Sequence, residues 1–260
     1  MTKTLPPAIR RLYPHDSKDM VALDTVYADP GWAPHADGTP WLALNMVSSV
    51  DGRATLGPSS TGLGSALDRH LMRVLRASAD VVLYGAGTLR VDRLGALITP
   101  DQAERRMAEG RAAWPLLAVM TASGEVDLTR AAAGARIVAF VAATTPRYAV
   151  EKLERYAAVY VAGEARPDPR TVKEMLGRTF GARAVLCEGG PHLNRSLLGA
   201  GLLDELFLTV GPSLVAGDGL PLVRGARLEP PVRLELSSLH MHENELYLRY
   251  RVDKRRGEDL

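Results

Sequence analysis

Residues 81–92 read VVLYGAGTLRVD and join an apolar strand pattern to a glycine turn. Four apolar residues precede the Gly-Ala-Gly of residues 85–87, and Thr88 and Asp92 follow it. A dinucleotide-binding fingerprint needs a third glycine where this chain has Arg90, so the G-x-G-x-x-G match fails. The two glycines still allow a backbone to approach a ligand closely. The stretch therefore predicts a strand that ends at a ligand-binding turn, with a tight turn that binds nothing as the alternative.

Short apolar runs like this one recur along the chain. They occupy residues 41–49, 81–85, 116–121, 137–141, 159–163, 184–190 and 206–212. Helical patterns lie between several of them, at residues 65–77, 146–157, 170–180 and 191–200. Ser65 is suited to cap the first of these helices. Strands that are apolar throughout and alternate with helices are typical of an α/β protein, with a mostly parallel sheet flanked by helices.

The two ends of the chain follow other patterns. Residues 232–252 alternate without a helix-length separation around a turn at residues 243–245, which predicts an antiparallel hairpin at the sheet edge. Residues 1–40 are rich in Pro, Asp and His and have no sustained period. We therefore expect an N-terminal arm over residues 1–40, one α/β domain over residues 41–252 and a charged tail over residues 253–260.

Composition narrows the class of protein. The 260 residues are 46% hydrophobic and 24% charged with a net charge of +2, an ordinary globular balance that predicts no nucleic-acid partner. No run approaches the roughly 20 apolar residues that span a bilayer, and no signal peptide is evident, so no membrane partner is expected. The single cysteine, Cys187, excludes an internal disulfide and argues against a metal site built on cysteines. These features favour a cytoplasmic protein without a bound metal.

A second glycine turn resembles an anion cradle. In LCEGGPHL, residues 186–193, Gly189 and Gly190 follow an apolar strand and Pro191 suits the first position of a helix. The free N–H groups at such a helix N-terminus favour an anion, although an ordinary turn is an equally good interpretation. Glu188 sits at the end of the strand, where it is either a hydrogen-bonding group in a crevice or a solvated loop residue.

Three arginines recur at helical spacing before the first glycine turn. They are Arg69, Arg73 and Arg76. Arginine near a helix C-terminus is favourable in itself, and that is the simpler interpretation. The alternative is that Arg76 holds an anionic group of a substrate through two parallel hydrogen bonds.

Three motifs in order resemble one family. They are NMVSSVDG (45–52), LRASADVVLYGAGTLRVD (75–92) and EGGPHLNRSLLGAGLLDELFLTVGP (188–212). Together they resemble the reductase domain of bacterial riboflavin biosynthesis, the 5-amino-6-(5-phosphoribosylamino)uracil reductase, which is related in fold to dihydrofolate reductase. The similarity covers roughly residues 41–250 and is greatest to stand-alone pyrimidine reductases of the actinobacterial type.

The resemblance implies NADPH as the cofactor and assigns residues to it. Thr88 would hydrogen-bond NADPH, the backbone near Val47 would face the nicotinamide, and Gly87 would let the chain turn close by. The pyrophosphate would be wrapped by Gly189, Gly190, Pro191, His192 and Leu193. Thr121 and Ser123 would lie where this fold usually grips the 2′-phosphate.

The resemblance also implies a substrate side. Asp92 would lie between cofactor and substrate and act as the catalytic carboxylate, Glu188 would meet the substrate, and Arg76 would hold its phosphate. Hydride would reach C1′ of the ring-opened ribosylamine. A two-fold homodimer is implied as well, covering the apolar strands near residues 202–215 and the C-terminal hairpin.

Two departures from the family pattern fall near the substrate. The family often has Asp-Asp-Pro where this chain has Asp92-Arg93-Leu94, and Trp-x-Thr where it has residues 62–65. Two alternatives therefore stay open. One is an NADPH-dependent reductase of dihydrofolate or of another pterin or pyrimidine, and the other is a non-catalytic NADPH-binding protein.

Overall fold

The computed structural model describes residues 5–14, 20–57, 59–91, 94, 96–129 and 134–254. The strands are β1 (Ala8–Tyr13), β2 (Met20–Ala22), β3 (Trp41–Ser49), β4 (Val81–Gly85), β5 (Leu116–Met120), β6 (Ile137–Val141), β7 (Ala158–Val161), β8 (Ala184–Cys187), β9 (Glu205–Gly211), β10 (Leu234–His242) and β11 (Glu245–Val252). The helices are the short 3₁₀ turn η1 (Leu23–Thr25), α1 (Ala66–Ser78), α2 (Ala86–Val91), α3 (Pro100–Ala108), α4 (Arg147–Glu154), α5 (Pro169–Arg178) and α6 (Pro191–Gly199).

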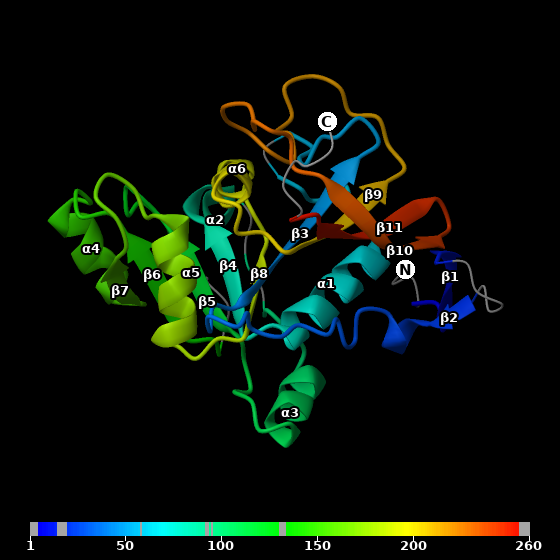
Figure 1. Ribbon diagram of the computed structural model, residues 1–260, viewed down its shortest axis with the longest axis horizontal. Coiled ribbons are helices and arrows are strands. Elements are labelled where there is room, and N and C mark those ends of the chain that lie inside the picture. The colour runs from blue at the N-terminus through cyan, green and yellow to red at the C-terminus, as the bar shows by residue number, and fades with distance from the viewer. Residues whose placement is uncertain are drawn as a thin grey trace.

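All the strands join one sheet, whose order is β2-β1-β10-β11-β9-β3-β8-β4-β5-β6-β7. From β9 to β7 each neighbouring pair is parallel, and from β2 to β9 each pair is antiparallel. Figure 1 shows β7 at one end of the molecule and β1 and β2 at the other. The predicted α/β fold, with a mostly parallel sheet and an antiparallel C-terminal hairpin, is confirmed.

The hairpin of β10 and β11 does not form the sheet edge, and that part of the prediction is wrong. Strand β1 pairs with β10, and β2 pairs with β1. A bare β10 would leave a row of unpaired backbone groups, and β1 supplies partners for them. The strand over residues 8–13 was not predicted, because its two adjacent arginines interrupt the alternation of apolar and polar side chains. The N-terminal arm thus contributes two strands to the sheet.

A buried carboxylate attaches the remainder of the arm to the sheet. Glu205, fully buried on β9, accepts hydrogen bonds from Trp32 Nε1 at 2.7 Å and from Arg249 Nε at 2.7 Å. Arg249 also donates to the carbonyl oxygen of Pro30 at 2.6 Å and lies over the ring of Phe207. Residues 30–32 are therefore fixed against the antiparallel half of the sheet.

Helices cover the two faces of the sheet in different places. Helix α1 buries Leu67, Leu71 and Leu75 on one face, and the Ser65 hydroxyl caps its N-terminus as predicted, accepting from the N–H groups of Leu67 and Asp68. Helices α5 and α6 pack on the other face, against Leu42, Leu44 and Leu83. These packing layers place α2 and α6 where β4 and β8 end (Figure 1).

No helix in the described ranges combines the length and the apolar character needed to cross a membrane.

Candidate active site

The two glycine turns meet at the carboxyl ends of the parallel strands. The Gly85 N–H donates to the Gly189 carbonyl oxygen at 2.7 Å. A Cβ added at Gly190 would lie 3.0 Å from Thr88 Oγ1, and one added at Gly189 would lie 3.2 Å from Met46 Sδ. Gly189 also adopts a φ of 81°, a backbone conformation that favours glycine. The ends of β3, β4 and β8 therefore lie close together, and side chains at these glycines would fill the space between them.

Helix α6 presents its N-terminus at the same place. Gly190 is its N-cap and Pro191 its first residue, and no side chain caps the helix. The first intrahelical hydrogen bond runs from the Asn194 N–H to the Gly190 carbonyl oxygen at 3.0 Å. The amide groups of His192 and Leu193 precede that bond, and N–H groups at this position of a helix have no partner within the helix and favour an anion. This helix end has the donors that a phosphate or pyrophosphate group requires.

The other residues predicted to bind the cofactor also lie near the carboxyl ends of the parallel strands. Val47 is half-buried near the end of β3, and Gly87 is exposed in α2. Thr121 follows β5, and its buried hydroxyl accepts from the Gly124 N–H at 3.0 Å. Ser123 is exposed, and its hydroxyl accepts from the N–H two residues later. Their contacts with a cofactor stay predictions.

Asp92 lies outside the described residues, one position beyond the end of α2. Its predicted catalytic role therefore stays a prediction that rests on the resemblance.

Two predicted substrate residues form a buried ion pair with each other. Arg76 Nε donates to Glu188 Oε1 at 2.7 Å, and Arg76 Nη2 donates to Glu188 Oε2 at 2.6 Å. Arg76 Nη2 also donates to the Tyr84 hydroxyl at 2.7 Å, and that hydroxyl donates to Glu188. The side chains of Arg76 and Glu188 are only 8% and 7% exposed. Helix α1, strand β4 and the end of β8 are thus joined by one polar cluster.

The cluster changes how the Arg76 guanidinium can be used. Its remaining nitrogen, Nη1, donates to the Leu97 carbonyl oxygen at 3.3 Å. Burial by itself would lower the pKa of Arg76, but the charge of Glu188 and the contact with Tyr84 raise it above its usual value. Glu188 takes the N–H groups of Nε and Nη2, so a substrate phosphate could form two parallel hydrogen bonds along that side of the guanidinium only by displacing Glu188. The predicted phosphate contact of Arg76 stays a prediction.

Sequence reasoning missed Tyr84 entirely. It reads as one more apolar residue of a buried strand, and its ring is indeed almost fully buried. Burial also raises the pKa of its hydroxyl well above the usual value, which keeps the hydroxyl a hydrogen-bond donor. A tyrosine in a strand that is otherwise Val and Leu was the available signal, since a buried hydroxyl needs a partner.

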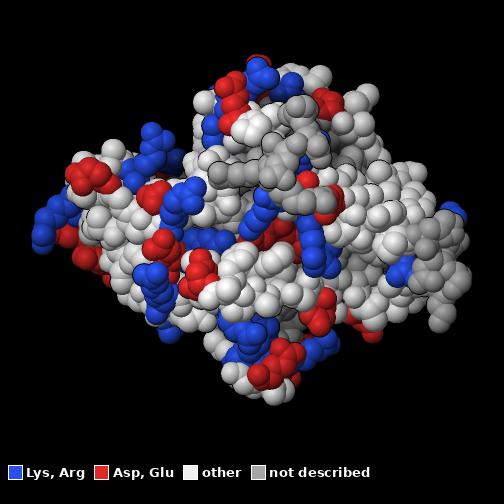
Figure 2. Space-filling model, in the orientation of Figure 1, with Lys and Arg blue, Asp and Glu red and all other residues white. Residues whose placement is uncertain are grey.

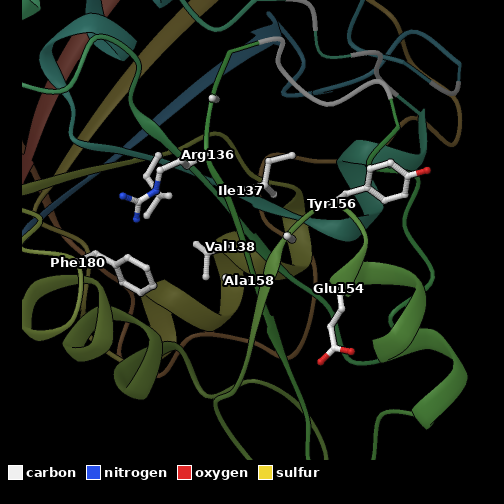
Figure 3. Close-up of a pocket in the computed structure, with 10 residues that line it drawn as sticks. Arg136, Ile137, Val138, Glu154, Tyr156, Ala158 and Phe180 are labelled. Atoms are coloured by element: carbon white, nitrogen blue, oxygen red, sulfur yellow. The ribbon is translucent and has the colours of Figure 1, made fainter.

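A pocket of about 490 Å³ opens at the amino ends of the parallel strands, away from the glycine turns (Figure 3). Its lining includes Leu116, Ile137 and Ala158, each at or next to the start of its strand, together with Arg136 and Phe180. None of the residues predicted for the site lines it. Since ligands of parallel sheets bind at the carboxyl ends of the strands, we place the candidate site at the glycine turns and not in this pocket.

The face of the molecule drawn in Figure 2 carries charges of both signs. On the face drawn in Figure 2, basic and acidic side chains are interspersed. Such a mixture lacks the single-sign field expected of a nucleic-acid-binding face.

Comparison with known proteins identifies relatives over most of the chain. The sequence model of the RibD C-terminal domain family matches residues 40–248. Two relatives are named 2,5-diamino-6-ribosylamino-4(3H)-pyrimidinone 5′-phosphate reductase. The Archaeoglobus fulgidus protein is 28% identical over 188 residues, which cover 71% of this chain and 85% of that protein. The Methanothermobacter thermautotrophicus protein is 26% identical over 219 residues, which cover 82% of this chain and 98% of that protein.

A solved structure shares the fold. A pyrimidine reductase-like protein from Corynebacterium diphtheriae matches with a TM-score of 0.72 and 23% sequence identity. The match covers 83% of this chain and 92% of that one. This likeness supports the predicted α/β architecture.

The polar cluster of Arg76, Tyr84 and Glu188 leads to a prediction about stability. Replacing either Arg76 or Glu188 by Met should lower the free energy of unfolding by about 3–5 kcal/mol, because the remaining partner is left buried without its counter-charge. The double Met variant should lose clearly less than the sum of the two single losses, with a coupling of about 1–3 kcal/mol. Urea unfolding of the four proteins measures this. Additive losses would show that the two side chains do not interact.

Proposed function

We propose, given that this chain belongs to the RibD C-terminal domain family, that it is an NADPH-dependent reductase of a phosphoribosylamino-pyrimidine in riboflavin biosynthesis. The observation that carries the proposal is the convergence of Gly85, Thr88 and the Gly189–Gly190 turn on the N-terminus of α6. The named activity of the relatives supports the choice of substrate.

The residues at the glycine turns fit a dinucleotide. A Cβ at Gly190 would press against the Thr88 hydroxyl, so the glycine leaves room beside a hydrogen-bonding group. We propose that Thr88 and residues 189–193 hold the pyrophosphate side of NADPH and that the backbone at Val47 faces the nicotinamide. Thr121 and Ser123 are proposed for the 2′-phosphate. When bound, NADPH supplies the hydride, and the protein supplies binding and orientation.

The acceptor of the hydride is C1′ of the ring-opened ribosylamine, drawn as an imine, and the product is a ribitylamino-pyrimidine phosphate. Asp92 is proposed to stabilise the protonated imine by its negative charge. Glu188 is proposed to meet the substrate, with Arg76 and Tyr84 keeping its carboxylate in one orientation. A carboxylate that is already oriented needs little reorganisation when the substrate binds.

The single buried thiol of Cys187 is compatible with a reducing compartment, and we propose that the protein works in the cytoplasm.

The activity can be tested directly by NADPH oxidation. We expect turnover with a phosphoribosylamino-pyrimidine and little or none with dihydrofolate, and tighter binding of NADPH than of NADH by calorimetry. Turnover with dihydrofolate alone would favour the pterin alternative. Cofactor binding without turnover of any substrate would favour a non-catalytic protein, and equal affinities for the two cofactors would contradict the proposed 2′-phosphate site.

Replacing Asp92 distinguishes a role in the hydride-transfer step from a role in cofactor binding. Asp92→Asn should keep the fold and the NADPH affinity and lower kcat by roughly 10²-fold or more, the usual scale for a positioned charge or acid. Steady-state kinetics and calorimetry on the same preparation measure both. If Asp92 only forms a turn, kcat will stay near the wild-type value while the unfolding free energy falls.

We also propose a homodimer, on the face of the antiparallel strands that lies opposite α1. Leu208 and Leu248 pair directly across β9 and β11, and Leu239 faces Leu248 from β10. All three are half-buried, whereas Phe207 and Tyr247 on the alternate positions are buried under the arm and α1. A second copy would cover this apolar face.

Light scattering should therefore give a mass near twice the 28.1 kDa of one chain. Leu248→Asp should lower it toward one chain, because the new charge would be buried in the interface. Met107→Asp, at a methionine that is 55% exposed on α3, is the matched control and should leave the dimer intact. A wild-type mass of one chain at micromolar concentration would contradict the proposal.

A further inference from the structure

Two pockets adjoin at the amino ends of the parallel strands, away from the candidate active site. The first is the pocket of about 490 Å³ in Figure 3, where Arg136 and Phe180 lie on one side and Tyr156 and Glu154 on the other. The second has a volume of about 410 Å³ and is lined by residues at or next to the starts of β4, β5 and β8. Leu116, Arg136 and Phe180 line both. Each pocket has the volume of a small-molecule site.

Positive charge exceeds negative charge in the second pocket. Among the described residues its lining contains Arg106, Arg111 and Arg136, against the one carboxylate of Asp80, and we call it the arginine pocket. That carboxylate is already in use. One oxygen accepts from Arg111 Nη2 at 2.9 Å, and the other accepts from two backbone N–H groups at 2.8 and 3.1 Å. Asp80 therefore pairs with Arg111 and leaves the other two arginines without a counter-charge in the pocket.

Arg106 is buried on α3 without a carboxylate partner. The residue is only 3% exposed. Its Nε donates to the Ala112 carbonyl oxygen at 2.9 Å, and its Nη1 donates to those of Ala77 and Ala79 at 2.6 and 2.7 Å. Within the described part of the chain its Nη2 forms no hydrogen bond and the side chain forms no ion pair. Burial is the main cause that lowers the pKa of Arg106 to about 10, and the positive charge of Arg111 adds to it. A bound anion would supply the missing counter-charge.

The rim of the arginine pocket places an unpaired guanidinium beside aromatic rings. Arg136 is exposed, and among the described residues its guanidinium has neither a hydrogen bond nor an ion pair. Trp114 and Phe180 are half-buried in the same lining. A Cβ added at Gly134 would lie 3.0 Å from Trp114 Nε1, so this glycine leaves the edge of the indole uncovered by a side chain. Flat rings pack on such side chains, and a neighbouring arginine binds an anionic substituent.

We propose that the arginine pocket is a second ligand site, which binds a planar aromatic molecule that carries a phosphate group. The phosphate would accept from the free N–H groups of Arg136 and balance the charge of Arg106, since a guanidinium matches the oxygens of a phosphate. The ring would lie against Trp114 and Phe180. Strand β4, five residues long, separates this pocket from the glycine turns by roughly 15 Å. The ligand would therefore bind together with NADPH and not in its place.

Calorimetry with adenosine 5′-monophosphate (AMP), in the presence of saturating NADPH, tests the inference. NADPH occupies the proposed cofactor site, so any heat from AMP reports a different site. Adenosine lacks the phosphate and inorganic phosphate lacks the ring, which makes them matched probes. AMP should bind at least about 10-fold more tightly than either, the scale of one charge-assisted hydrogen bond. Its affinity should fall as the salt concentration rises.

Two variants and a control assign the binding to the arginine pocket. Arg136→Gln should weaken AMP binding by about 10-fold and should leave the urea midpoint unchanged, because the side chain has no partner to lose. Trp114→Leu should weaken the binding of AMP and of adenosine alike, since both place the ring on the indole. Arg166→Gln changes an exposed arginine that lines neither pocket and should leave AMP binding unchanged.

The outcomes separate the inference from the proposed function. AMP binding that NADPH abolishes, or that keeps its full affinity in Arg136→Gln, would overturn the inference and leave the proposed function standing. The absence of any heat from AMP would do the same. A protein that does not bind NADPH would contradict the proposed function alone, because the comparison of wild type with Arg136→Gln then tests the arginine pocket without NADPH.

Discussion

The bidentate pair between Arg76 and Glu188 joins the three parts of the molecule on which the candidate site depends. Arg76 comes from α1, Glu188 from the end of β8, and Tyr84 from β4 completes the cluster. A buried guanidinium that lost its carboxylate would be left charged and unpaired, which is strongly unfavourable. The pair therefore fixes the position of α1 against the ends of the strands. It also holds Glu188 in place, and the glycine turn begins at the next residue.

The site then divides by the two faces of the sheet. On the face of α6, glycines at both turns let backbone segments lie close together beside a helix N-terminus, which suits a phosphate-bearing cofactor. On the face of α1, Glu188 lies at the end of β8, where Arg76 and Tyr84 hold its carboxylate in one orientation.

Sequence reasoning succeeded where local chemistry decides the structure. The helix over residues 65–77 was predictable because its apolar spacing and its Ser65 cap lie within a few residues of each other. The mostly parallel sheet was predictable because apolar strand patterns alternate with helical patterns along the chain. Among the elements that were missed, β1 and α2 have no local mark in the sequence. Strand β1 exists through pairing with β10, which is more than 200 residues away in the chain, and α2 is a six-residue helix that continues directly from β4. The contact of Arg76 with Glu188, 112 residues apart, was equally invisible, since either side chain alone fits a surface role.

The proposed function requires hydride transfer to the sugar carbon of a pyrimidine ribosylamine, with the pyrimidine ring left intact. The most direct measurement uses NADPH that carries deuterium on the transferable position of the nicotinamide, followed by NMR of the isolated product. Hydride transfer to the sugar carbon predicts deuterium at C1′ of the ribityl chain and none on the pyrimidine. Deuterium in the ring, or a product without deuterium, would contradict it.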